Sequence, residues 1–167
     1  MNELHKAYLN LGSNIQPEIN LVRAIQSLSE CGEVRGVSNA WESKAVGKLA
    51  PNYLNACILF LSSLSKFDLK EKIVRPIEAD LGRVRSEDKF IPRTIDIDII
   101  LFDDQLQKDS FWKDAFVVIP LAEIYPEYQN SITRKSIAEI STQLQEKVWM
   151  KARPEVLNQF REKPSPR

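Results

Sequence analysis

Two aspartates stand inside one of the most apolar stretches of the chain, "TIDIDIILF", at residues 94–102. In an extended strand, residues two apart lie on one face and are about 7 Å apart. Asp96 and Asp98 are therefore expected to be neighbours on one face. The opposite face is apolar and is formed by three isoleucines, Ile95, Ile97 and Ile99.

Two carboxylates held this close repel each other unless a cation lies between them. Mg²⁺ typically binds one or two protein carboxylates and completes its coordination with phosphate oxygens and water. Asp96 and Asp98 thus predict a site for a pair of Mg²⁺ ions bridging to a phosphorylated ligand. The alternative is a strand whose second face is simply solvated, which is the commoner meaning of an isolated D-x-D pattern.

Basic side chains precede this acidic pair. Cations next to a metal-binding carboxylate pair suit a polyphosphate, whereas cations in a solvated loop would only balance nearby acids. The chain contains no G-x-x-x-x-G-K-[ST] loop, so side chains and Mg²⁺ would have to hold the phosphates. The segment at 83–93 contains Arg83, Arg85, Lys89 and Arg93 against Glu87 and Asp88.

The composition narrows the class of protein. Lys plus Arg and Asp plus Glu number 23 each, so no overall field favours nucleic acid or an anionic membrane. The 167 residues, 43% of them hydrophobic, suit one globular domain. Cys31 and Cys57 have no metal-ligand spacing and read as reduced core residues. The first residues lack a signal-peptide pattern, so we expect a cytoplasmic protein that acts on small molecules.

The periodicities predict the elements that must position the acidic strand. Their order, strand, helix, strand, strand, helix, strand, is that of a ferredoxin-like βαββαβ sandwich. We expect an α+β fold with a mostly antiparallel sheet, one domain over 1–150 and a polar tail over 151–167. The predicted elements are strands at 7–14, 33–46, 53–63 and 94–102, helices at 17–31, 65–83 (kinked by Pro76) and 131–148, and a short strand with a helical turn at 117–126.

Five segments together resemble the hydroxymethyldihydropterin pyrophosphokinase family. They are "LGSN" at 11–14, "YLN" at 53–55, "IEADLGRVR" at 77–85, "PRTIDIDIILFD" at 92–103 and "PLAEIYP" at 120–126, and the resemblance covers about 1–145. It implies transfer of diphosphate from ATP to the hydroxymethyl group of 6-hydroxymethyl-7,8-dihydropterin, with release of AMP, in folate biosynthesis. It also implies two Mg²⁺ ions, with ATP as co-substrate.

The resemblance assigns roles to particular residues. The implied catalytic set is Arg83, Arg93, Asp96 and Asp98, the two aspartates being the metal ligands. The implied ATP contacts are Glu78, Arg83, Arg85, Lys89, Arg93, Ile99 and Trp112. The implied pterin contacts are Ala45, Val46, Tyr53, Asn55 and Phe116. A flat heterocycle suits aromatic walls and an amide partner, although Tyr53 alone would also fit a half-buried strand position.

The chain departs from the family pattern in two places. Phe90 and Ile91 stand where the family usually has Trp and Gly. The segment at 103–115 is shorter than usual and lacks a Pro-His pair and an Arg, so Lys108 or Lys113 would have to supply the cation. Trp112 would either stack on adenine or fill the core.

These departures leave two other functions open. One is a catalytically weak relative that binds pterin or nucleotide through an altered adenine pocket. The other is a ferredoxin-like interaction or RNA-binding module, against which the balanced charge argues. The oligomeric state stays open, and a monomer is compatible with the sequence.

Overall fold

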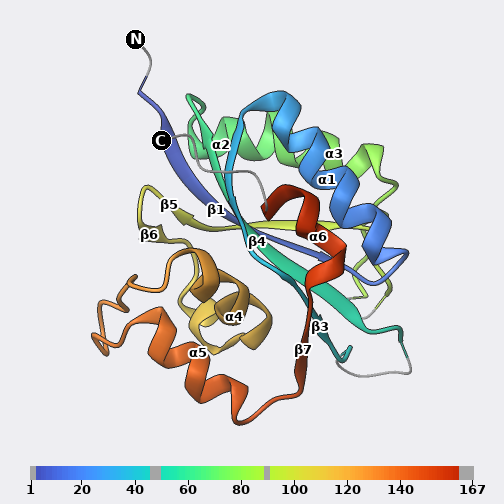
Figure 1. The fold of residues 1–167 in the computed structure, drawn as a ribbon. Helices are drawn as coiled ribbons and strands as arrows, with labels where there is room; N and C mark the ends of the chain where they lie inside the picture. The colour runs from blue at the N-terminus through green and yellow to red at the C-terminus, as the bar shows by residue number, and fades with distance from the viewer. Residues whose placement is uncertain (1–2, 46–49, 89–90, 162–167) are drawn as a thin grey trace.

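The computed structural model describes residues 3–45, 50–88 and 91–161, so the predictions for Val46, Lys89 and Phe90 lie outside the described residues. Its centre is a seven-stranded sheet in the order β6-β5-β1-β4-β3-β7, with β2 also paired to β4 (Figure 1). Each of these strand pairs is antiparallel. The strands are β1 (His5–Ser13), β2 (Glu33–Val37), β3 (Ala40–Ser43), β4 (Tyr53–Ser62), β5 (Asp96–Phe102), β6 (Gln105–Leu106) and β7 (Met150–Arg153).

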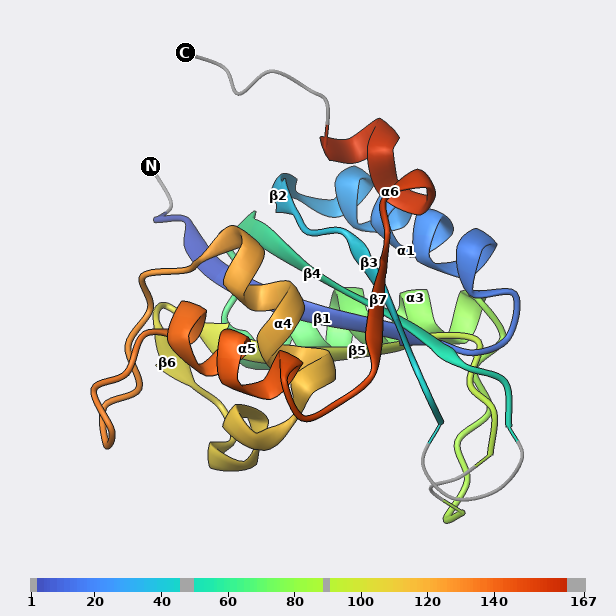
Figure 2. The same cartoon turned by 60° about the horizontal axis from the view of Figure 1, so that its bottom comes forward.

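Helices cover both faces of the sheet, which confirms the predicted α+β class (Figure 2). The first hydrophobic core lies between the sheet and the helices at 17–31, 66–80 and 154–161. The second lies under the α4–α5 pair. The helical elements are α1 (Pro17–Cys31), α2 (Lys66–Leu69), a π-helical turn (Lys70–Val74), α3 (Arg75–Asp80), a 3₁₀ turn (Asp109–Lys113), α4 (Ala115–Ile124), α5 (Ile137–Gln145) and α6 (Pro154–Arg161).

A β-bulge in β5 fixes which side chains face each core. Tyr8 pairs with Leu101 and Leu9 pairs with Ile99, which leaves Ile100 as the extra residue. Ile100 and Leu101 therefore both enter the second core. Before the bulge the strand alternates regularly, so its isoleucines face the first core and its aspartates face the side of α4.

The helical segment after β4 begins and bends as predicted. Ser65 caps it, because its Oγ accepts a hydrogen bond of 3.1 Å from the backbone N–H of Asp68. The expected kink is confirmed as a five-residue π-helical turn that ends where α3 begins, with Pro76 in the first turn of α3. Proline is tolerated there because the first N–H groups of a helix have no helical partner.

Two predicted strands were wrong in extent or type. The strand at 33–46 is broken at Ser38, whose backbone N–H and side-chain Oγ both bond to the backbone of Cys57 at 2.9 Å. The short strand predicted within 117–126 is part of the helix α4. Its residues from Val117 to Leu121 are all buried, and a helix buried all round shows no 3.6-residue period to recognise.

The C-terminal region also differs from the sequence prediction. The last predicted helix begins later, at Ile137, where Ser136 and Glu139 form a capping box. The segment expected as a polar tail, 151–167, contains all of α6 and all but the first residue of β7, which pairs with β3. Leu157 of α6 is fully buried in the first core. No helix in the described residues is both long and apolar enough to cross a lipid bilayer.

Candidate functional site

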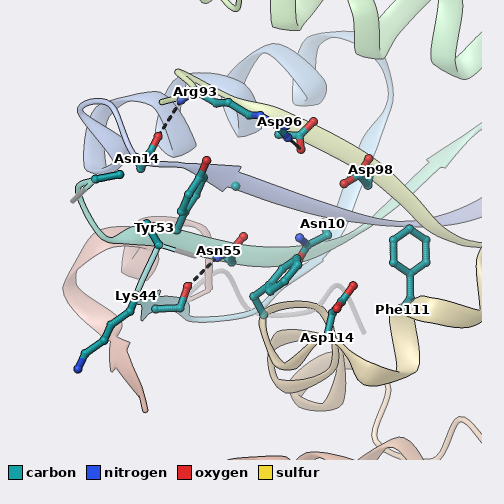
Figure 3. Close-up of a pocket in the computed structure, with 15 residues that line it drawn as sticks. Asn10, Asn14, Lys44, Tyr53, Asn55, Arg93, Asp96, Asp98, Phe111 and Asp114 are labelled. Atoms are coloured by element: carbon teal, nitrogen blue, oxygen red, sulfur yellow. Dashed lines mark hydrogen bonds and ion pairs between the residues drawn. The ribbon is translucent and has the colours of Figure 1, made fainter. Parts of the chain in front are cut away.

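A cavity of about 320 Å³ opens on the sheet face that the α4–α5 pair leaves partly uncovered (Figure 3). Its floor comes from β1, β4 and the start of β5, and its rim comes from β3 and from the chain around the start of α4. Such a concave site with a few convergent polar groups is typical of small-molecule binding. The lining residues are Asn10, Gly12, Asn14, Ser43, Lys44, Ala45, Ala50, Tyr53, Asn55, Arg93, Asp96, Asp98, Phe111, Asp114 and Phe116.

Asp96 is held by two arginines. Its Oδ1 lies 3.0 Å from Nη1 of Arg83, and its Oδ2 accepts a hydrogen bond of 2.8 Å from Nη1 of Arg93. Both carboxylate oxygens are thus neutralised within the protein. Arg83 and Arg93, which were predicted to lie near the acidic pair, therefore both contact Asp96.

Asp98 has a different environment. Its carboxylate makes no hydrogen bond or ion pair with another residue in the described parts of the chain. Its side chain opens into the cavity, yet desolvation by the surrounding protein, with the nearby charges of Asp96 and Glu78, raises its pKa to about 6. Arg83 and Lys108 oppose this shift. Asp98 is therefore the acid of this pair that most needs an added cation.

Glu78 forms ion pairs with two arginines, Arg83 and Arg85. This residue is only 3% exposed, and its carboxylate pairs with Arg83 and, at 3.3 Å, with Nη2 of Arg85. It also accepts a hydrogen bond of 3.1 Å from the backbone N–H of Ile97, which ties it to β5. Burial raises the pKa of Glu78, although the Arg83 charge acts in the opposite direction. Glu78 does not line the cavity, so its geometric role is to position the arginines.

Asn14 fixes the segment that carries Arg93. The backbone N–H of Arg93 donates to Oδ1 of Asn14 at 2.7 Å, and the backbone N–H of Asn14 donates to the Arg93 carbonyl at 3.0 Å. This reciprocal pair joins the end of β1 to the chain just before β5. The "LGSN" segment and the start of the acidic strand are therefore held together.

Tyr53 and Asn55 form the other side of the cavity (Figure 3). Both lie on β4, two residues apart, and Asn55 is only 5% exposed. Its Nδ2 donates to Oγ of Ser43 at 3.4 Å. Gly12 faces Asn55 across the sheet, and a Cβ at Gly12 would lie 2.7 Å from Oδ1 of Asn55, so glycine leaves room for that amide.

The acidic pair fits Mg²⁺ better than a metal that needs a complete protein cage. The described residues contain no group of three or more His, Cys, Asp or Glu side chains placed to hold a metal ion. Two carboxylates on one strand face, open to a cavity, leave the remaining positions for phosphate oxygens and water, as Mg²⁺ prefers. Asp96 and Asp98 would be the protein ligands. Arg83 has a buried Nε without a partner in the described structure, which suits an anion alongside.

Most of the predicted site residues that the structure describes lie in the cavity or directly behind it. Arg83 and Glu78 do not line it, but they pair with each other, and Arg83 contacts the lining residue Asp96. Three other predicted residues lie apart. Ile99 packs against the first core, and Arg85 lies on a separate small hollow beside Arg83. Trp112 packs in the second core, with its ring centroid 5.6 Å from that of Tyr128. It therefore fills the core, which is one of the two roles that the sequence left open for it. Of the predicted pterin contacts, the structure describes four, Ala45, Tyr53, Asn55 and Phe116, and all four line the cavity.

Several lining residues were not identified from the sequence, among them Asn10, Lys44, Phe111 and Asp114. Asn10 had a usable signal, since it is a polar residue inside the apolar strand "AYLNLG" and faces the same side as Gly12. Asp114 had none, because its position depends on how α4 packs on the sheet.

Comparisons with known proteins identify the family. The family model for 7,8-dihydro-6-hydroxymethylpterin-pyrophosphokinase (HPPK) matches residues 8–126. A protein of Synechocystis sp. named 2-amino-4-hydroxy-6-hydroxymethyldihydropteridine pyrophosphokinase is 35% identical over 149 residues, which is 83% of this chain and 75% of that protein. A protein of the same name from Aquifex aeolicus is 36% identical over 142 residues, 79% of this chain and 88% of that protein.

Solved structures agree at the level of the fold. The crystal structure of Plasmodium falciparum HPPK-DHPS with pterin and p-hydroxybenzoate matches with a TM-score of 0.68 at 13% identity. That match covers 86% of this chain but only 44% of the solved chain, so the chain spans less than half of that protein. The family model covers more than half of this chain, and both relatives exceed 30% identity over most of it. The chain therefore belongs to the 7,8-dihydro-6-hydroxymethylpterin-pyrophosphokinase family.

Proposed function

We propose that the cavity between β1, β4, β5 and α4 is where this chain carries out the reaction of its family. The protein transfers diphosphate from ATP to the hydroxymethyl group of 6-hydroxymethyl-7,8-dihydropterin and releases AMP, in folate biosynthesis. The observation that carries the proposal is the acidic pair Asp96 and Asp98, which lines the cavity next to Arg93 and opposite Tyr53 and Asn55.

The ATP phosphates bind at the acidic end. Asp96 and Asp98 would hold Mg²⁺, two ions being expected, and the metal would supply charge neutralisation for the triphosphate. Arg83 and Arg93 now neutralise Asp96. Both guanidinium groups can equally donate to phosphate oxygens, for which their planar array of N–H groups is suited. Glu78 keeps Arg83 near the site throughout.

The pterin binds at the opposite end. Tyr53 and Phe116 provide two aromatic walls, Asn55 reads the edge of the heterocycle, and Ala45 contributes a small apolar contact. The hydroxymethyl group then faces Asp96 and Asp98, and Asp98 is the side chain best placed to accept its proton. Holding the two substrates in this order provides most of the catalysis, since phosphoryl transfer depends on positioning and charge stabilisation.

Lys108 supplies the cation that the shortened segment would otherwise lack. Lys108 does not itself line the cavity, but its Nζ lies 5.9 Å from the ring centroid of Phe111, which does. Its charge also lowers the pKa of both Asp98 and Asp114. Lys113 instead lines an adjoining hollow with Trp149. We therefore assign to Lys108 a contact with the ATP phosphates, and no observation in the comparisons favours the alternative of a catalytically weak relative.

The proposal includes a cytoplasmic location. Cys31 and Cys57 are both free thiols, which fits the reducing cytoplasm. Only Cys57 is buried; Cys31 is exposed, so its prediction as a core residue was wrong.

Calorimetric titration of a non-cleavable α,β-methylene analogue of ATP tests the metal assignment. Binding to the wild type should weaken at least about tenfold when Mg²⁺ is replaced by EDTA. Asp96→Asn and Asp98→Asn should each lose most of this Mg²⁺ dependence, whereas Asp80→Asn, at an exposed position outside the cavity, should keep it. Unchanged Mg²⁺ dependence in both cavity variants would show that these aspartates do not hold the metal.

A further inference from the structure

Glu123 belongs to the "PLAEIYP" segment at 120–126, which the proposed reaction does not use. Its carboxylate, near the end of α4, accepts three hydrogen bonds from the sheet side. Oε1 accepts from the indole N–H of Trp41, while Oε2 accepts from Nδ2 of Asn39 at 3.0 Å and from its backbone N–H at 3.4 Å. Nη2 of Arg161 on α6 lies 3.6 Å from the same Oε2. One carboxylate thus joins α4 to β3, to the residue before β3, and to α6.

Trp41 links this carboxylate to the proposed pterin side of the cavity. It is paired with Asn55 across β3 and β4, and Ser43 further along β3 is paired with Tyr53. Directly opposed residues of an antiparallel pair have their side chains on the same face of the sheet. Trp41 therefore lies on the face that carries Tyr53 and Asn55 and that α4 packs against (Figure 3).

Phe116 is the residue of α4 that lines the cavity on the same side as Glu123. The two are seven residues apart, so they share one face of the helix and lie about 10 Å apart along its axis. Pro120 between them has no N–H to donate to the Phe116 carbonyl, but the residues at 117–121 are all buried. Because their packing holds both turns in place, the position of Glu123 affects the position of Phe116.

We propose that Glu123 is a positioning residue for the pterin. By fixing α4 against β3, it sets the distance between Phe116 on one wall of the cavity and the strands that carry Tyr53 and Asn55 on the other. Two walls hold a flat ring well only when both are within contact distance, so a shift of α4 should cost affinity. The inference rests on the proposed placement of the pterin in this cavity.

Glu123→Gln and Trp41→Phe test the contact with little change in volume. Gln keeps one acceptor oxygen but turns an amino group toward a donor, and Phe lacks the indole N–H. Each variant should weaken the binding of 6-hydroxymethylpterin about five- to tenfold, in calorimetric titrations that contain Mg²⁺ and the α,β-methylene analogue of ATP. Binding of the ATP analogue without pterin should change less than about twofold, since Asp96 and Asp98 lie on β5.

The double variant shows whether the two residues act through one contact. If they do, its loss of pterin affinity should be about that of the stronger single variant. Losses that multiply in full would mean that Glu123 and Trp41 act separately, and would overturn the proposal. An equal loss of affinity for the ATP analogue would overturn it as well, because it would show a general disturbance of the cavity.

Ser136→Ala is the matched control for lost stability. Ser136 caps α5, which packs on α4, and its Oγ accepts from the backbone N–H of Glu139 at 3.2 Å outside the cavity. This variant should lower the melting temperature and leave pterin affinity unchanged.

The outcomes separate this inference from the proposed function. If the wild type binds the pterin and Glu123→Gln lowers only the melting temperature, as Ser136→Ala does, Glu123 has a structural role alone and the inference is wrong. If the wild type itself does not bind the pterin, the proposed placement of the substrate fails and the inference fails with it.

Discussion

Replacing Asp98 by Asn should stabilise the metal-free protein while abolishing turnover. In the structure the Asp98 carboxylate has no hydrogen bond or ion pair with a described residue, and its pKa is raised from 3.8 to about 6. The ionised form is therefore disfavoured in the folded state. Asn removes this charge without changing the size of the side chain.

The magnitude follows from the pKa shift and the exposure of the group. A shift of one pKa unit corresponds to about 1.4 kcal/mol, so the whole shift corresponds to about 3 kcal/mol. Asp98 opens into a solvent-accessible cavity, where water screens its charge. We therefore expect a gain of only about 1 kcal/mol in the free energy of unfolding at about pH 7.5.

The gain must depend on pH in a particular direction. Below about pH 4 the acid is protonated in both the folded and the unfolded chain, so wild type and Asp98→Asn differ little. Between about pH 4 and 6 the unfolded wild type loses its proton while the folded wild type keeps it, so the wild type loses stability as the pH rises. Above about pH 6 the difference stays constant.

Urea unfolding in EDTA, followed by circular dichroism at about pH 3.5, 5 and 7.5, measures this difference. The Asp80→Asn variant controls for a general effect of removing one negative charge. A lower stability of Asp98→Asn at about pH 7.5 would show that Asp98 has a favourable internal partner, and would refute its description as an acid that lacks a cation. A gain that persists unchanged at about pH 3.5 would equally exclude the pKa shift as its cause.

Three further predictions concern other parts of the molecule. Gly12→Ala places a Cβ 2.7 Å from Oδ1 of Asn55, so pterin affinity should fall about tenfold in a fluorescence titration; an unchanged affinity would mean that the amide does not read the ligand. Lys108→Ala should raise the KM for ATP about tenfold in steady-state assays without changing pterin affinity, whereas Lys113→Ala should change neither; equal effects would contradict the assignment of Lys108. Leu157→Ala should cost about 2 to 5 kcal/mol in urea unfolding, because Leu157 is fully buried, and a loss under about 0.5 kcal/mol would show that α6 does not contribute to the core.

The sequence was most informative where polar residues interrupt a regular apolar pattern. Alternation alone predicted that Asp96 and Asp98 share a face, and the pairing of β5 with β1 confirms it. The boundaries of α1 followed from Pro17 and from the helical spacing up to Cys31. In these segments the local period and the tertiary environment favour the same structure.

The secondary-structure predictions failed where burial, rather than a periodic pattern of apolar residues, determines the structure. The helix α4 is apolar on every side, so its β-branched residues suggested a strand, and only its packing between the sheet and α5 makes it a helix. The C-terminal helix α6 was hidden by charges and prolines, although Val156, Leu157 and Phe160 lie on one face and pack on the first core. Neither error affected the acidic strand.

The site was predicted only in part, because some of its residues lie outside recognisable motifs. Residues inside recognisable motifs, such as Tyr53, Asn55 and Arg93, could be assigned before the fold was known. Asp114 could not, because it reaches the cavity only through the packing of α4, at a distance in sequence from every other lining strand.

The central claim is that this cavity holds ATP and the pterin so that diphosphate passes between them. Incubation of the protein with ATP, Mg²⁺ and 6-hydroxymethyl-7,8-dihydropterin, followed by chromatographic analysis of the nucleotides, measures it directly. We predict equal amounts of AMP and pterin diphosphate, formed only when all three compounds are present and absent in Asp96→Asn. Formation of ADP, or of AMP without the pterin, would contradict the claim.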